Sequence, residues 1–142
     1  MPGFSKGLAQ QIFDATLAPS RTNLTAKAGV WMSLHTAAPN DETGGSEATY
    51  GGYARVNIAA SMTSSTTGTA PEQTITATNS ADINFPASTG PTQTVTHWAI
   101  WSDAVIGTSS YLMYSGALSS SRSVQSGDVV VIPAGQLSIA LT

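Results

Sequence analysis

The chain has no cysteine, and only 9% of its 142 residues are charged. Without thiols there are no disulfides, no thiolate catalysis and no cysteine metal sites. Five lysines and arginines against eight acidic residues leave a net charge of −3. That is too little positive charge for a nucleic-acid interface. No apolar run approaches the roughly 20 residues needed to span a bilayer, so we expect no membrane insertion.

Hydroxyl side chains are abundant instead, because serine and threonine together account for 38 residues. Average soluble domains carry about 25% charged residues, so hydroxyls replace charges as the polar surface of this protein. Three tryptophans, four tyrosines and three phenylalanines are sufficient to form a core, and the low charge is not typical of disordered chains. The length predicts a single domain over residues 1–142.

The N-terminal segment has the only convincing helical pattern, and we predict a helix at about residues 4–18. Its apolar residues follow a 4-4-1-4 spacing that places them on one stripe. The stripe residues are Phe4, Leu8, Ile12, Phe13 and Leu17. Ser5 is positioned to cap the start, and Pro19 ends the segment. The stripe either covers one edge of the domain or forms an assembly interface with a neighbouring subunit.

The rest of the chain alternates with period two, which predicts about eight short strands. Those strands are expected at 30–35, 53–58, 74–78, 83–85, 95–101, 111–114, 128–132 and 136–141. The segment 95–101 is the most apolar and is predicted to be central, whereas 74–78 is predicted at an edge. Residues 61–72 are expected to form an exposed loop, and the last two strands a hairpin. The fold class is therefore mainly β, an antiparallel, jelly-roll-like β-sandwich with one N-terminal α-helix.

Chemical motifs are scarce. His35 and His97 are the only imidazoles, and no G-x-S-x-G nucleophile motif occurs. The two histidines are not at a short metal-ligand spacing. The acidic turn at 40–47 lacks the spacing of a calcium loop. We therefore predict no enzyme activity, no catalytic residue, no metal site and no cofactor.

Aromatic residues offer a second kind of contact. Tyr50 and Tyr53 lie in a glycine-containing segment that we predict to be an exposed contact loop, since aromatic rings on a β scaffold stack on sugars. Trp98 and Trp101 fall on opposite faces of one strand, so at most one of them points to a site.

Three stretches carry a family resemblance: SLHTAAPNDETGGSEATYGGYARVNI, SADINFPASTGPTQTVTHWAIWSDA and LMYSGALSSSRSVQSGDVVVIPAGQLSIAL. In this order they resemble a family of small tailed-phage virion proteins, described as tail-fibre or head-decoration proteins, over nearly all of residues 4–141. The resemblance implies no catalytic residues. It implies structural glycines at turns and strand ends, namely Gly51, Gly52, Gly116, Gly127 and Gly135.

Three functions follow as expectations. The first is a capsid decoration or cement protein on the outer head, a homo-oligomer such as a trimer that staples major capsid protein subunits through repeated modest contacts. The alternative is a tail-fibre or baseplate component that contacts a host surface glycan. A virion-associated glycan hydrolase is the third, disfavoured reading. All three place the protein in the virion, and the first places it on the head.

Overall fold

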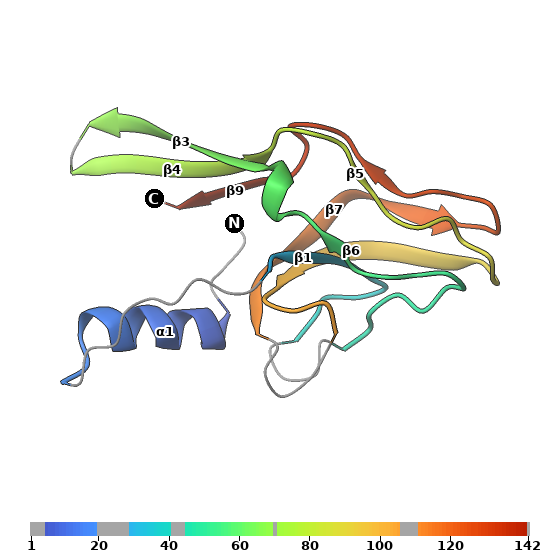
Figure 1. Cartoon of the computed structure of the whole chain (residues 1–142), viewed down its shortest axis with the longest axis horizontal. Coiled ribbons are helices and arrows are strands. Elements are labelled where there is room, and N and C mark those ends of the chain that lie inside the picture. Colours follow the sequence, from blue (N-terminus) through green and yellow to red (C-terminus); the bar gives the residue numbers. More distant parts are fainter. Residues whose placement is uncertain (1–4, 20–28, 41–44, 70, 106–110, 142) are drawn as a thin grey trace.

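Nine strands and one α-helix form the described part of the chain in this computed structural model (Figure 1). The structure describes residues 5–19, 29–40, 45–69, 71–105 and 111–141. The elements are α1 (Lys6–Thr16), β1 (Trp31–His35), β2 (Val56–Asn57), the 3-10 turn η1 (Ala59–Ser61), β3 (Met62–Thr69), β4 (Glu72–Asn79), β5 (Ile83–Asn84), β6 (Gln93–Trp101), β7 (Leu112–Val124), β8 (Val131–Ile132) and β9 (Ser138–Leu141). The predicted class, mainly β with one N-terminal helix, is confirmed.

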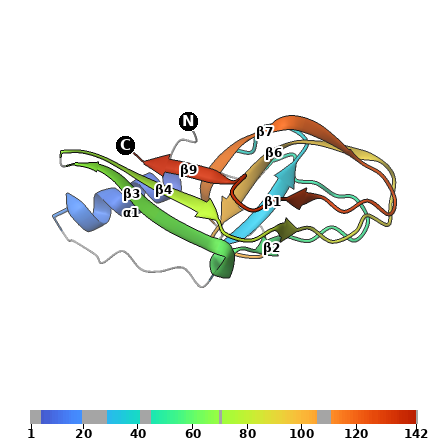
Figure 2. The same ribbon diagram turned by 90° about the horizontal axis from the view of Figure 1, so that it is seen from above.

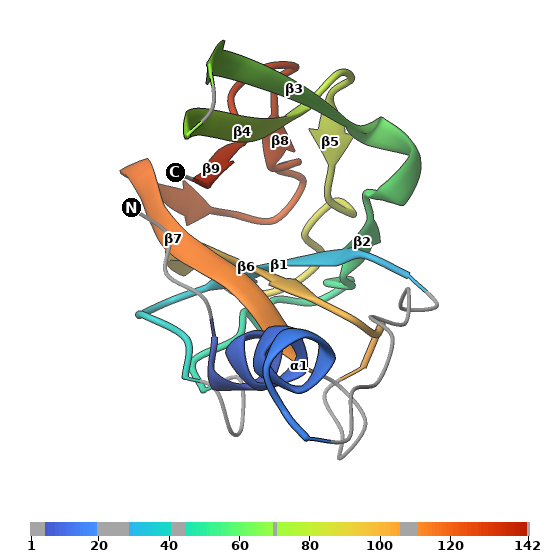
Figure 3. The ribbon, with the colours of Figure 1, turned by 90° about the vertical axis from the view of Figure 1, so that its left-hand side faces the viewer.

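The strands form three antiparallel sheets. A four-stranded sheet has the order β2-β1-β6-β7, a three-stranded sheet has the order β3-β4-β9, and β5 pairs with β8. Figure 3 shows the four-stranded sheet in the middle, with β3, β4 and β9 on one side and α1 on the other. Strand β6 lies between β1 and β7, so its predicted central place is confirmed.

The main core lies between the sheets. It is built from side chains that alternate along the strands and meet from both layers. Its buried members include Met32, Leu34, Tyr50, Ile58, Ile83, Phe85, Val95, Trp98, Ile100, Val124, Val130, Leu137 and Ile139. A second, smaller cluster of Ala99, Trp101 and Leu112 occupies the opposite face of the four-stranded sheet. Trp98 and Trp101 are therefore on opposite faces, as predicted.

Helix α1 begins where the sequence indicates. The Ser5 side chain accepts a hydrogen bond from the Leu8 N–H at 3.2 Å, which is an N-cap. Ser5 is itself buried and donates to the Leu112 carbonyl, so the cap also attaches α1 to the start of β7. No residue within α1 is buried, and Phe13 and Leu17 are 50% and 72% exposed. Phe4 lies outside the described residues.

Residues 61–72 differ from the expected loop. They contain β3, which pairs with β4 in a continuous register from Met62↔Asn79 to Thr69↔Glu72. Strand β4 is consequently central in its sheet, not at an edge. The hairpin extends beyond the four-stranded sheet (Figures 1 and 2), and β3 is exposed along most of its length. A strand that is exposed on both faces needs no apolar alternation, so the sequence carries no period-two signal here.

Three other strands also differ from expectation. Strand β7 continues to Val124 instead of ending near 114, because its second half is a polar edge strand without apolar alternation. The predicted final hairpin is wrong, since β8 pairs with β5 and β9 pairs with β4. The strand expected at 53–58 is reduced to β2, and Arg55, which precedes it, is buried.

Candidate functional site

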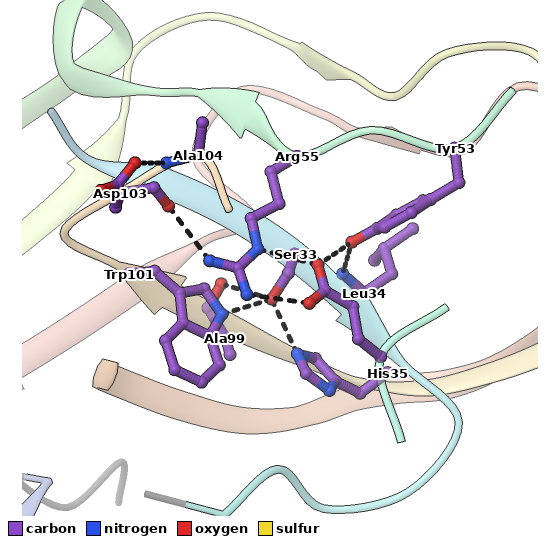
Figure 4. Close-up of polar contacts among 10 residues, drawn as sticks. Ser33, Leu34, His35, Tyr53, Arg55, Ala99, Trp101, Asp103 and Ala104 are labelled. Carbon is purple, nitrogen blue, oxygen red and sulfur yellow. Dashed lines mark hydrogen bonds and ion pairs between the residues drawn. The ribbon is translucent and has the colours of Figure 1, made fainter. Parts of the chain in front are cut away.

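A buried polar cluster occupies the face of the four-stranded sheet opposite the main core (Figure 4). The Trp101 indole N–H donates to Ser33 Oγ at 2.7 Å, and Ser33 Oγ lies 2.7 Å from His35 Nε2. These residues meet because β1 and β6 are paired in register, with Ser33 opposite Ala99 and Trp31 opposite Trp101. Ser33 and His35 are fully buried, and burial lowers the pKa of His35 below its usual 6.5.

An ion pair lies beside this cluster. The Arg55 guanidinium donates to both carboxylate oxygens of Glu47 at 2.8 Å, in a bidentate geometry. It also donates to the Asp103 carbonyl at 3.0 Å and stands 4.4 Å from the centre of the Trp101 ring. The exposed fractions of the Arg55 and Glu47 side chains are 3% and 15%. This pair therefore connects the segment before β2, the Glu47 segment and the loop after β6.

The two tyrosines of the expected contact loop are built into this interior. Tyr50 is only 3% exposed. The Tyr53 hydroxyl donates to Glu47 Oε1 at 2.9 Å and accepts the Leu34 N–H at 3.1 Å. Burial, reinforced by the Glu47 charge, raises the Tyr53 pKa far above its ordinary value. The two rings contact each other edge-on, so this pair organises the fold and does not present an exposed aromatic surface.

The glycines implied by the resemblance have several roles. Gly52, Gly127 and Gly135 have positive φ angles, which non-glycine residues adopt at a cost. Gly51 has no such angle but packs against Thr89 and Gly90. Gly116 lies within β7, directly opposite Trp98. A Cβ there would lie 2.8 Å from Trp98 Cζ2, so only glycine allows β7 to pass this close to the indole.

A groove of about 670 Å³ opens where β7 separates from β8 and β9. We call it the β7–β9 groove. Its floor is apolar and includes Met32, Trp98 and Leu137. One wall is formed by residues of β7, and the other by β8 with the turn leading to β9. The volume lies within the roughly 300–1,000 Å³ range of small-ligand sites.

A β-bulge shapes the β7 wall. The pairs Val95↔Arg122 and His97↔Ala117 leave Thr96 of β6 facing four residues of β7, 118–121. The extra residues turn the strand away from its partner at the groove, as bulges often do beside functional sites. The side chains that the groove presents are mostly hydroxyls and amides. Its polar lining residues are Ser115, Ser119, Ser120, Arg122, Gln136 and Ser138.

No acidic residue lines the groove, and Arg122 is its only charged residue. Within the described part of the chain, Arg55 forms an ion pair with Glu47, whereas Arg122 forms none. Sequence reasoning did not single out Arg122, because an arginine in a serine-rich run is typical of a solvated surface. One signal was available, since Arg122 is the only basic residue after Arg55.

Among the described residues, no three histidine or acidic side chains gather into a group that could hold a metal ion. No helix in the same ranges has the length and apolar character needed to cross a membrane.

The comparison with family models decides the family. A model described as podophage GP4 fiber I protein gp80 matches residues 3–140. The chain belongs to this family. No curated protein matches the chain. Membership of a phage fibre family confirms the resemblance to small phage virion proteins and makes this chain a structural protein of the virion.

Proposed function

We propose that this fibre-family protein is a tail-fibre component that contacts the host surface, and that the β7–β9 groove binds a host saccharide. The observation that carries the proposal is the groove itself, in which serine and glutamine side chains border an apolar floor. Sugars combine apolar C–H faces with hydroxyls. A site that joins an apolar floor to hydrogen-bonding side chains complements both features.

The family description supports a fibre and so favours the tail over the outer head. No observation in the structure favours capsid decoration, the first expectation from the sequence. The exposed hydroxyl surface of the β3–β4 hairpin suits a protein that meets solvent and polysaccharide. We further propose a non-enzymatic role, because the serine–histidine contact at Ser33 and His35 is buried beyond the reach of a substrate.

The location is tested by immunogold electron microscopy of intact virions with an antibody against this protein. We expect label at the tail. Label spread over the head would replace this proposal with the decoration role. Purified protein should also bind cells of a host strain and compete with phage adsorption. Absence of both effects would refute host contact.

The groove is tested by filling it. Ser120 is exposed and lines the groove, so Ser120→Trp should fold and block binding to host cells. Ser123→Trp is the matched control, because Ser123 is exposed on the same strand but outside the groove, paired with Thr94. Equal binding by both variants would show that the groove is not the contact site.

A further inference from the structure

We infer that the β7–β9 groove takes a saccharide carrying an acidic group, with Arg122 as the contact for the anion. This inference rests on the proposed function and adds the chemical class of the ligand. It starts from the isolated charge of Arg122, which shares the groove with no carboxylate.

The chemistry of Arg122 suits the binding of an anion. The guanidinium is always charged and presents a planar fork of donors that matches carboxylate and phosphate groups. Arg55, the other arginine that the structure describes, already has both carboxylate oxygens of Glu47. The Arg122 fork has no such partner in the described residues, so its donors remain for a ligand.

The position of Arg122 on β7 also supports a role in ligand binding. Arg122 is paired with the buried residue Val95, and its neighbour along the chain on the same side, Val124, is also buried. Paired residues of antiparallel strands share a face of the sheet, so the Arg122 side chain leaves β7 on the side of the core and the groove. Arg122 is itself exposed, so its charged end is accessible to a ligand in the groove that it lines.

The charge of the whole protein makes the site selective. A net charge of −3 repels polyanions in general, so acidic polysaccharide has no broad attraction to this surface. Affinity for an anion must come from a local arrangement. In the groove, Arg122 would bind the acid group, while Gln136 and Ser138, which also line it, contact ring hydroxyls.

The test uses surface polysaccharide extracted from a host strain in three forms: native, carboxyl-reduced and dephosphorylated. Binding to purified protein is measured by isothermal titration calorimetry. We expect native material to bind, and one of the two treatments to abolish binding, which identifies the acid group as carboxylate or phosphate. Arg122→Gln should weaken native binding about tenfold, the scale of one charged hydrogen bond, and Arg122→Lys should recover part of it.

Lys6→Gln is the matched control. It removes the same charge from the exposed start of α1 and should leave affinity unchanged. Equal binding of all three polysaccharide forms, with no effect of Arg122→Gln, would overturn the acidic ligand while host contact stands. No binding of the native form, together with no binding to cells, would refute the proposed function itself. If Arg122→Gln aggregates but its soluble fraction binds normally, the role of Arg122 is to prevent aggregation through the exposed edge of β7. The inference then fails.

Discussion

The ion pair between Arg55 and Glu47 allows a sharp prediction about stability. Glu47→Ala removes the acceptor of two guanidinium hydrogen bonds and of the Tyr53 hydroxyl, while Arg55 stays 3% exposed beside Trp101. A buried pair broken on one side costs about 3–5 kcal/mol, because the remaining charge is buried without compensation. Glu47 is 15% exposed, so water will relieve part of that cost, and we expect about 3 kcal/mol.

The assay is urea unfolding followed by tryptophan fluorescence. With an m value of about 2 kcal/mol/M, a loss of about 3 kcal/mol lowers the midpoint by roughly 1.5 M. Glu72→Ala is the matched control, because Glu72 is an exposed acid at the start of β4. It should shift stability by no more than about 0.5 kcal/mol.

A double-mutant cycle then isolates the pair. Arg55→Met keeps an apolar stem against Trp101 and removes the charge, so Glu47→Ala combined with Arg55→Met should be more stable than Glu47→Ala alone. The expected coupling energy is about 2 kcal/mol. A loss below about 1 kcal/mol in Glu47→Ala, or additive effects in the double variant, would refute the reasoning that the pair is desolvated and essential to this face.

Three further predictions concern other parts of the molecule. Because burial lowers the His35 pKa below 6.5, the unfolded chain takes up the proton first as the pH falls. The free energy of unfolding should therefore be at its full value above pH 6.5 and decline below it by at most ~1.4 kcal/mol per pH unit. In His35→Gln, the urea midpoint measured at several pH values should fall less steeply with decreasing pH. Gly116→Val should lower the thermal midpoint, since its Cβ meets Trp98 at 2.8 Å, whereas Gly116 variants with wild-type melting would contradict that contact. Ile12→Asp places a charge on the α1 stripe, where no residue is buried; it should leave the monomer's melting unchanged but block self-association or incorporation into particles, as measured by analytical ultracentrifugation and virion composition.

Local patterns in the sequence were enough to predict helix α1 and strand β6. The spacing from Leu8 to Leu17 predicted α1, and the cap at Ser5 is confirmed. The apolar character of residues 95–101 predicted a central strand, confirmed as β6. Both signals are local, because the spacing of apolar residues and the length of an apolar run are properties of the segment itself. Composition was informative in the same way. The scarcity of lysine and arginine argued against a nucleic-acid partner, and the abundance of hydroxyls indicated an uncharged polar surface.

The pairing of the strands and the assembly of the groove could be known only from the tertiary structure. Strand β3 and the second half of β7 are exposed, so their sequences show no apolar alternation and gave no warning of strands. The pairings of β8 and β9 depend on which edges are free in the folded sheets, not on the tight connection between them. The candidate site has the same origin. Trp98, Arg122 and Gln136 come from separate segments, and only the bulge in β7 and the sheet packing bring an indole, a cation and hydroxyls into one groove.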